Sequence, residues 1–293
     1  MERVKIGAAE VIRIEESYEP NFDAALFFPD WRPEVVAPHL GWMAPDHYDA
    51  ATAWLKLSVH SWLIRIGNRA IIIDTCVGDH KPRPARPKWH MKETRWLAHL
   101  AAAGVRPEQV ELVMCTHLHV DHVGWNTRLE NGSWVPTFPN ARYLFSKEDY
   151  EHYLAVDRDP AQGPANHGAF RDSVLPVVES GQAQMVSGSE AIDENLSLAP
   201  APGHTPGSMS VNLASEGAAA VFCGDAIHHA IQVHFPEWCS FVCLDKPSAR
   251  RSRRRILEGC AGSGALLMPT HFGAPFTCRI DEAHGGFVPR FGA

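Results

Sequence analysis

Short apolar runs that end at glycine, proline or polar residues recur along the chain and predict an α/β fold rich in strands. Residues 55–66 mix alternating apolar and polar positions with a continuous apolar stretch, and residues 70–74 are apolar again. Because Gly67 and Asn68 separate these two runs, the segment predicts a β-hairpin. Further buried strands are predicted at residues 112–115, 220–223 and 265–268.

Three segments carry the signals of helices. Residues 92–103 place several apolar side chains on one helical face, and Gly104 follows as a helix stop. Ser146 precedes two acidic residues, which is typical of a helix start, and predicts a helix through about residue 154. A third helix is predicted after residues 245–248, ending near Gly259. Together with the strands, these helices predict a sandwich of sheets and helices.

Aromatic residues gather in the first 54 residues, where prolines interrupt them and predict an irregular arm instead of a strand or helix. Large rings need burial, so we expect the arm to line the mouth of a site or to dock on a second subunit. We therefore predict an N-terminal extension over residues 1–54 and a single domain over residues 55–293. The aromatic residues of the extension are Phe22, Phe27, Phe28, Trp31, Trp42 and Trp54.

The densest chemistry lies in residues 115–122, directly after a predicted strand, where three histidines and one aspartate occupy six positions. Imidazoles and a carboxylate are costly to crowd together unless a cation lies between them. Nitrogen and carboxylate ligands suit zinc, and also iron, manganese or cobalt. A run of surface histidines is the alternative, and the position of the motif after a strand argues against it.

Three more metal-capable residues follow at the ends of predicted structural segments. His204 lies in a turn rich in glycine and proline, Asp225 follows the apolar run at 220–223, and His271 follows the run at 265–268. In α/β proteins, functional residues collect at the carboxyl ends of strands. These positions therefore predict one shared site.

In this order, the residues resemble the metallo-β-lactamase fold superfamily, whose hallmark is His-x-His-x-Asp-His followed by a lone His, an Asp and a last His. The resemblance covers roughly residues 55–275 and implies an α/β fold of the αββα sandwich type with two divalent metal ions. Asp74 ends its strand much as Asp225 does, but the resemblance implies a supporting role for it. The implied ligands are His117, His119 and His204 for one metal, Asp121, His122 and His271 for the second, and Asp225 as the bridge.

The resemblance also implies a hydrolase in which two metals lower the pKa of a bridging water, so that hydroxide attacks an electrophilic carbonyl or phosphorus. Asp121 is the first catalytic candidate, as a ligand that also accepts a hydrogen bond from the hydroxide. His228 is the second, because related acyl-homoserine lactonases carry a tyrosine at this place, three residues after the bridging aspartate. A histidine there either donates a hydrogen bond or a proton, or only lines the site.

Within the superfamily, several substrate classes fit this chain poorly. Residues 285–293 lack the basic set that a glyoxalase II needs for glutathione, and zinc β-lactamases usually lack the bridging aspartate. The best match is a dinuclear hydrolase that opens a lactone or cleaves a carboxylic ester of an apolar small molecule. The first alternative is a phosphotriesterase similar to methyl-parathion hydrolase. A β-lactamase, a glyoxalase II-like thioesterase and a non-catalytic metal-binding scaffold are weaker alternatives.

Charge narrows the choice of partner. The net charge of −7, from 27 basic and 34 acidic residues, argues against a nucleic-acid partner and favours a small-molecule substrate. The arginine-rich residues 250–255 are interpreted as a solvated helix face in preference to a phosphate site. A homodimer is expected from the aromatic extension.

Cysteine usage and hydropathy predict the compartment. Seven scattered cysteines argue against a disulfide framework and favour the cytoplasm, and the pair Cys239 and Cys243 is disfavoured as a second metal or redox site. No apolar run reaches the ~18 residues that a membrane span needs, and the N-terminus lacks the apolar core of a signal peptide. We therefore expect no membrane association.

Overall fold

The computed structural model describes residues 2–283 and 285–292, and the chain forms two compact units. The first unit comprises the chain up to Glu16 together with Val59–Glu190, and the second comprises Ser17–Ser58 together with the chain from Ala191 onward. The predicted extension, residues 1–54, therefore contributes to both units. Its separation from residues 55–293 stays a prediction.

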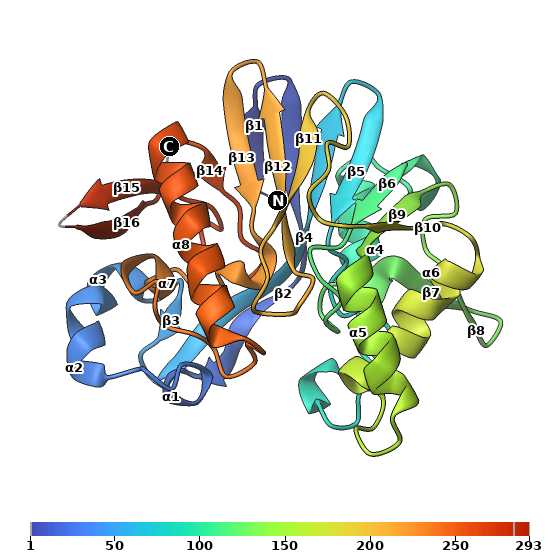
Figure 1. The fold of residues 1–293 in the computed structure, drawn as a ribbon, viewed down its shortest axis with the longest axis horizontal. Coiled ribbons are helices and arrows are strands. Elements are labelled where there is room, and N and C mark those ends of the chain that lie inside the picture. Colours follow the sequence, from blue (N-terminus) through green and yellow to red (C-terminus); the bar gives the residue numbers. More distant parts are fainter. Residues whose placement is uncertain (1, 284, 293) are drawn as a thin grey trace. The chain divides into compact units, whose positions relative to one another are not determined.

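The first unit is built on a mixed sheet whose strands follow the order β1-β2-β4-β5-β6-β9-β10 (Figure 1). The β4–β5 pair is the predicted hairpin, and Gly67 turns the chain with a φ of 57°. Strands β5, β6, β9 and β10 are parallel, so their carboxyl ends lie on one edge. The strands are β1 (Arg3–Ile6), β2 (Ala9–Asp23), β4 (Trp54–Ile66), β5 (Arg69–Ile73), β6 (Leu112–Met114), β9 (Arg142–Ser146) and β10 (Ala183–Val186).

Helices and a small hairpin complete the first unit. Helix α5 begins where predicted, because the Ser146 side chain accepts a hydrogen bond from the Asp149 backbone N–H. The helix predicted at residues 92–103 begins only at Trp96, and the Thr94 backbone N–H that precedes it donates to Asp79 Oδ1 at 2.9 Å. The elements are α4 (Trp96–Ala102), α5 (Lys147–Arg158), α6 (Leu175–Glu179), β7 (Thr127–Glu130) and β8 (Ser133–Pro136).

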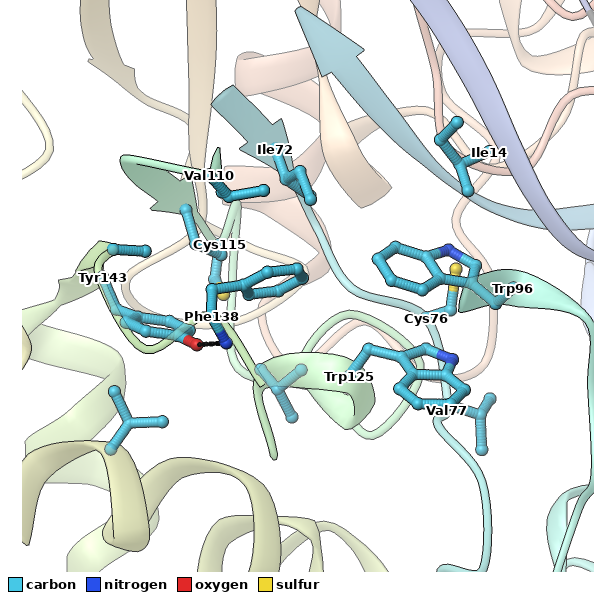
Figure 2. Close-up of a cluster of buried hydrophobic side chains, with 14 of the residues drawn as sticks. Ile14, Ile72, Cys76, Val77, Trp96, Val110, Cys115, Trp125, Phe138 and Tyr143 are labelled. Atoms are coloured by element: carbon cyan, nitrogen blue, oxygen red, sulfur yellow. Dashed lines mark hydrogen bonds between the residues drawn. The ribbon is translucent and has the colours of Figure 1, made fainter. Parts of the chain in front are cut away.

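The core of the first unit is aromatic, as Figure 2 shows. The rings of Trp96 and Trp125 stack with centroids 5.4 Å apart. The Tyr143 hydroxyl accepts from the Phe138 backbone N–H at 3.1 Å and donates to the Asn126 carbonyl at 3.1 Å, so its polar end is satisfied inside the core. This core fixes the segment that follows β6.

The second unit contains a sheet of order β11-β12-β13-β14, in which β13 and β14 are parallel and helix α8 packs against β13 (Figure 1). Helix α8 begins after the Asp245 cap and ends at Ser263, four residues beyond the predicted end, with Gly264 as its C-cap. The elements are β11 (Leu196–Pro200), β12 (Met209–Ser215), β13 (Ala218–Phe222), β14 (Leu266–Leu267), α7 (Ile231–His234), α8 (Lys246–Ser263), β15 (Arg279–Ala283) and β16 (Gly286–Arg290).

The aromatic segment of the extension is regular, so the prediction of an irregular arm was wrong. Phe22 lies in β2, and short helices and a strand follow: α1 (Ala24–Phe27), α2 (Pro33–Val36), α3 (Leu40–Met43) and β3 (Tyr48–Asp49). Phe27, Phe28 and Trp31 are buried within the second unit itself: Trp31 is only 7 % exposed and stacks on Tyr48, with centroids 5.7 Å apart. Packing against Trp238, 6.0 Å from Trp31, buries this indole without a second subunit.

Among the residues that the structure describes, no helix combines the length and apolar character needed to cross a membrane. All seven cysteines are buried free thiols.

A close backbone approach holds the segment that follows the histidine motif. A Cβ atom at Gly124 would lie 1.8 Å from the Val77 carbonyl oxygen, so only glycine fits. The buried Glu16 carboxylate fixes the other side by accepting from the Gly78 backbone N–H at 2.9 Å and from Trp125 Nε1 at 3.1 Å. Burial of the carboxyl raises the pKa of Glu16, and Lys92 opposes this rise.

We predict that Gly124→Ala lowers the free energy of unfolding by at least about 2 kcal/mol, because the backbone of residues 77 and 78 must move. Gly259→Ala is the control, since nothing lies within 4 Å of a Cβ at this helical position, and it should add roughly 0.5–1 kcal/mol. Urea unfolding followed by circular dichroism measures both. Equal stabilities of the two variants would contradict the steric argument.

Candidate metal centre

In the first unit, the histidine motif forms the loop that follows β6, and hydrogen bonds fix its backbone. Leu118 donates its backbone N–H to Asp149 Oδ2 at 3.1 Å, and its carbonyl accepts from Asn166 Nδ2 at 2.6 Å. The His122 carbonyl accepts from the Thr75 backbone N–H at 2.8 Å. The loop is therefore held from both of its ends.

The side chains of this loop converge. The His117 ring lies 4.0 Å from the His122 ring and 4.7 Å from the His119 ring, centroid to centroid. Asp121 Oδ1 lies 4.0 Å from His122 Nε2. His117 and His122 are buried, whereas His119 and Asp121 are partly exposed. The first unit thus gathers the four ligands predicted from the motif.

Asp74 orients two of these rings. Its carboxylate accepts from His122 Nδ1 at 2.8 Å and from the Thr116 hydroxyl at 2.9 Å. Because the Thr116 hydroxyl donates its hydrogen to Asp74, its oxygen accepts from His117 Nδ1 at 3.1 Å. Both Nδ1 atoms therefore carry hydrogen, which leaves each Nε2 as a lone-pair donor for a metal. This geometry agrees with the supporting role predicted for Asp74.

In the second unit, Asp225 follows β13 and faces two of the predicted ligands. Its Oδ2 lies 3.2 Å from His204 Nε2, and its Oδ1 lies 3.1 Å from His271 Nε2. The two oxygens of one carboxylate thus face two different imidazoles. That arrangement suits a carboxylate that bridges two cations.

The hydrogen bonds of His271 show why a cation fits beside Asp225. His271 Nδ1 lies 2.7 Å from the Ser58 carbonyl oxygen, which can only accept, so Nδ1 carries the hydrogen. In the neutral ring, Nε2 then presents a lone pair to Asp225 Oδ1, which is also an acceptor. Two buried acceptors at this distance repel unless a second proton or a metal cation lies between them.

A tight turn positions His204. Gly203 has a φ of 129°, and a Cβ there would lie 2.0 Å from the backbone nitrogen of Ala249. The His204 carbonyl accepts from the Leu244 backbone N–H at 3.2 Å, and Cys243 Sγ lies 3.8 Å from His204 Nδ1. The glycine is therefore needed both for its dihedral angle and for its contact with α8.

His228 lies beside Asp225 but is enclosed. Its Nε2 is 3.3 Å from Asp225 Oδ2 and 3.5 Å from Ser240 Oγ, and the Phe27 ring meets it edge-on at 5.5 Å. Burial lowers the pKa of His228 to about 3, although Asp225 opposes this shift. A neutral ring facing a carboxylate donates through Nε2–H, which agrees with a site-lining position.

The prediction of a solvated helix face for the arginine-rich residues 250–255 was wrong for Arg253. Arg253 is fully buried and donates to the carbonyls of Ala226, Pro236 and Trp238 at 2.6–2.8 Å. Arg250 and Arg254, by contrast, are on the surface and pair with Glu237. Arg253 therefore holds the backbone that follows Asp225 in place. The sequence could not distinguish Arg253 from the other polar residues of this run.

The comparison with protein families agrees with this geometry. Residues 54–271 match the model of the metallo-beta-lactamase superfamily, and the chain therefore belongs to this superfamily. A relative from Bacillus subtilis (strain 168), described as uncharacterized protein YobT, is 32% identical over 155 residues. This match covers 50% of the present chain and 61% of the relative, so it spans about three fifths of the relative's length.

Two solved structures share the fold. The hydrolase AbOPH of the beta lactamase superfamily has a TM-score of 0.82 and 22% identity, covering 100% of this chain and 97% of its own. AidC, a dizinc quorum-quenching lactonase solved with a product, has a TM-score of 0.77 and 19% identity, with the same coverage. The predicted α/β sandwich of the metallo-β-lactamase type is thereby confirmed.

We predict that Asp74→Asn weakens zinc binding about 10–100-fold. The Asp74 carboxylate orients His122 directly and His117 through Thr116, and the substitution replaces one of its two accepting oxygens. A competition titration with a chromophoric chelator measures the affinity. Asp157→Asn is the matched control, since the Asp157 carboxylate, 11 % exposed, pairs with the largely exposed Arg171 of the same unit. If both variants bound zinc as the wild type does, Asp74 would not be an orienting group.

Proposed function

We propose that the protein is a metal-dependent hydrolase with a dinuclear centre, which acts on lactones or carboxylic esters of apolar small molecules. The observation that carries the proposal is the Asp225 carboxylate, whose two oxygens face His204 and His271 at 3.2 and 3.1 Å. Membership of the metallo-β-lactamase superfamily supports it.

In this proposal, each of the two metal ions has its own set of ligands. The orientation of His117, His122 and His271 through their Nδ1 hydrogens supports Nε2 as the ligating atom in each. Zinc is the proposed metal, because borderline nitrogen and carboxylate donors suit it, with iron, manganese and cobalt as alternatives. One metal takes His117, His119 and His204, the second takes Asp121, His122 and His271, and Asp225 bridges them.

When bound, two divalent ions supply a water of lowered pKa and polarise the oxygen of the electrophile. The chain's residues prepare the site for that chemistry. Asp121 is partly exposed, so in addition to ligating it can accept the proton of the attacking water. His228 donates to Asp225 and holds this carboxylate in place, so we propose a positioning role for it and not proton transfer.

Aromatic packing supports the apolar substrate class. Phe27 contacts His228 edge-on, and Phe241 lies 5.9 Å from Phe27 and 6.5 Å from Phe22. Phe241 is 46 % exposed, so this cluster presents an apolar surface within the second unit beside Asp225 and His228. AidC, whose name describes a lactonase, offers a precedent for a lactone substrate. A homodimer stays part of the proposal.

The decisive experiment combines metal analysis with a substrate panel. Zinc-reconstituted protein should contain about two metals per chain and should turn over lactones or aryl esters faster than phosphotriesters and β-lactams. Chelation should abolish this activity and zinc should restore it. Faster phosphotriester hydrolysis would favour the alternative chemistry, and one metal without turnover would indicate a scaffold.

We predict that Asp225→Ala removes the metal pair and lowers kcat/KM at least about 100-fold, because the cations lose their shared anion. Metal content after dialysis and initial rates with an aryl ester measure the effect. Asp281→Ala is the control, since Asp281 pairs with Arg290 on an exposed hairpin. An Asp225→Ala protein with both metals and full activity would disprove the bridge.

We predict that Phe241→Ala raises KM for an apolar aryl ester about 3–10-fold and leaves kcat within about twofold, because the ring supplies uniform apolar binding. Leu129→Ala is the matched control, since Leu129 is 45 % exposed on the β7–β8 hairpin of the first unit. Equal effects of the two substitutions would remove Phe241 from the substrate surface.

A further inference from the structure

Two cysteines that the metal centre does not use lie together in the second unit. Cys239 and Cys243 form one buried cluster with Ala249 and are 1 and 6 % exposed. Cys243 Sγ also lies 3.4 Å from Ser240 Oγ and 3.8 Å from His204 Nδ1. One thiol of the pair therefore touches a proposed metal ligand.

The second observation is a buried cation beside this pair. Arg253 is fully buried, is in no ion pair among the described residues, and satisfies three N–H groups on backbone carbonyls. Its Nη2 has no hydrogen-bond partner within the described part of the chain, and its Nη1 lies 3.9 Å from Cys239 Sγ. A buried guanidinium without a carboxylate needs another anion, and a thiolate is the nearest group that can supply one.

The pKa of Cys239 agrees with the position of this thiol beside Arg253. A hydrogen bond from Cys243 and the charge of Arg253 lower the pKa of Cys239 to about 6, although burial opposes the shift. The lowered pKa makes Cys239 the sulfur that supplies a thiolate, and in its protonated form the Cys239 thiol donates to the Lys246 carbonyl at 3.6 Å.

We propose that Cys239 and Cys243 form a peroxide-sensitive thiol pair, and that their oxidation to a disulfide loosens His204. The disulfide itself is independent of the proposed function, whereas its consequence for metal binding rests on it. The oxidant we propose is hydrogen peroxide, because the two thiols are only 1 and 6 % exposed and a small uncharged molecule is the kind that can reach them.

The chemistry balances with peroxide as the oxidant. The Cys239 thiolate attacks one peroxide oxygen, the O–O bond breaks, and Cys239 sulfenic acid and hydroxide form. Cys243 sulfur then attacks the Cys239 sulfur, the S–O bond breaks, and the S–H proton leaves with the hydroxyl group as water. Two sulfurs are each oxidised by one electron, and the peroxide is reduced by two.

The contacts of Cys243 explain the expected effect on the metal centre. In the reduced pair, Cys243 sulfur lies at His204 Nδ1 and can accept its hydrogen, which supports a ligating Nε2. In the disulfide, the Cys243 sulfur is bonded to Cys239 and turns toward it. Ser240, which contacts both Cys243 and His228, must then rearrange as well.

The experiment treats the zinc-loaded protein with a small excess of hydrogen peroxide. Mass spectrometry of a proteolytic digest should show a peptide 2 Da lighter that joins Cys239 to Cys243. Zinc affinity should fall about 10-fold or more and recover with dithiothreitol. Alkylation of Cys239 by iodoacetamide should reach half its maximal rate near pH 6, well below the value for a free cysteine.

Two variants make the test specific. Cys239→Ser should keep zinc and basal activity and become insensitive to peroxide, whereas Cys260→Ala, a buried thiol elsewhere in the unit, should respond as the wild type does. Absence of the joined peptide would overturn the thiol pair. A joined peptide with unchanged zinc affinity would overturn only the link to His204, and failure of the proposed function would instead appear as no zinc-dependent turnover in untreated protein.

Discussion

The main physical constraint on the candidate metal centre is the repulsion between two buried hydrogen-bond acceptors that face one another. Asp225 Oδ1 and His271 Nε2 lie 3.1 Å apart. The Ser58 carbonyl accepts the hydrogen of His271 Nδ1, so the neutral His271 ring has no hydrogen on Nε2 to donate to the carboxylate. Such a pair is unfavourable in a low-dielectric interior unless a positive charge is shared between its members. A cation placed between these two atoms would relieve the repulsion, so this position suits a metal ion.

Hydrogen bonds to carboxylates and carbonyls hold the candidate ligands in place, so that the repelling acceptors cannot move apart. Asp74 fixes two rings in the first unit, one of them through the Thr116 hydroxyl, and Glu16 holds the neighbouring backbone at Gly78. In the second unit, Arg253 ties the carbonyl that follows Asp225 to those of Pro236 and Trp238. Each of these buried charged groups bonds several backbone or side-chain groups at once, so it favours a single arrangement of the backbone around it.

The sequence predicted the fold class, and the elements that carry the candidate ligands, better than it predicted the groups that support those side chains. Strand ends are local features, so the runs before His117, Asp225 and His271 could be interpreted from apolar periodicity alone. The Ser58 carbonyl that orients His271 is 213 positions away, and any residue type supplies a carbonyl, so no pattern could reveal it. Tertiary contacts likewise overrode local preference where the helix at 92–103 lost its first turn and where the aromatic arm became regular.

The replacement of a tyrosine by His228, relative to the lactonases that the motif resembles, changes what this position can do. A phenol keeps its proton at neutral pH and can turn its hydroxyl toward a substrate, whereas His228 commits its Nε2–H to Asp225 and is packed against Phe27. Burial keeps the ring neutral, so it acts as a fixed dipole on the carboxylate. In the proposed hydrolase, stabilisation of an oxygen on the substrate would then fall to the metal ions, and the aromatic cluster of Phe22, Phe27 and Phe241 would select substrates by shape and apolar contact instead of by a directed hydrogen bond.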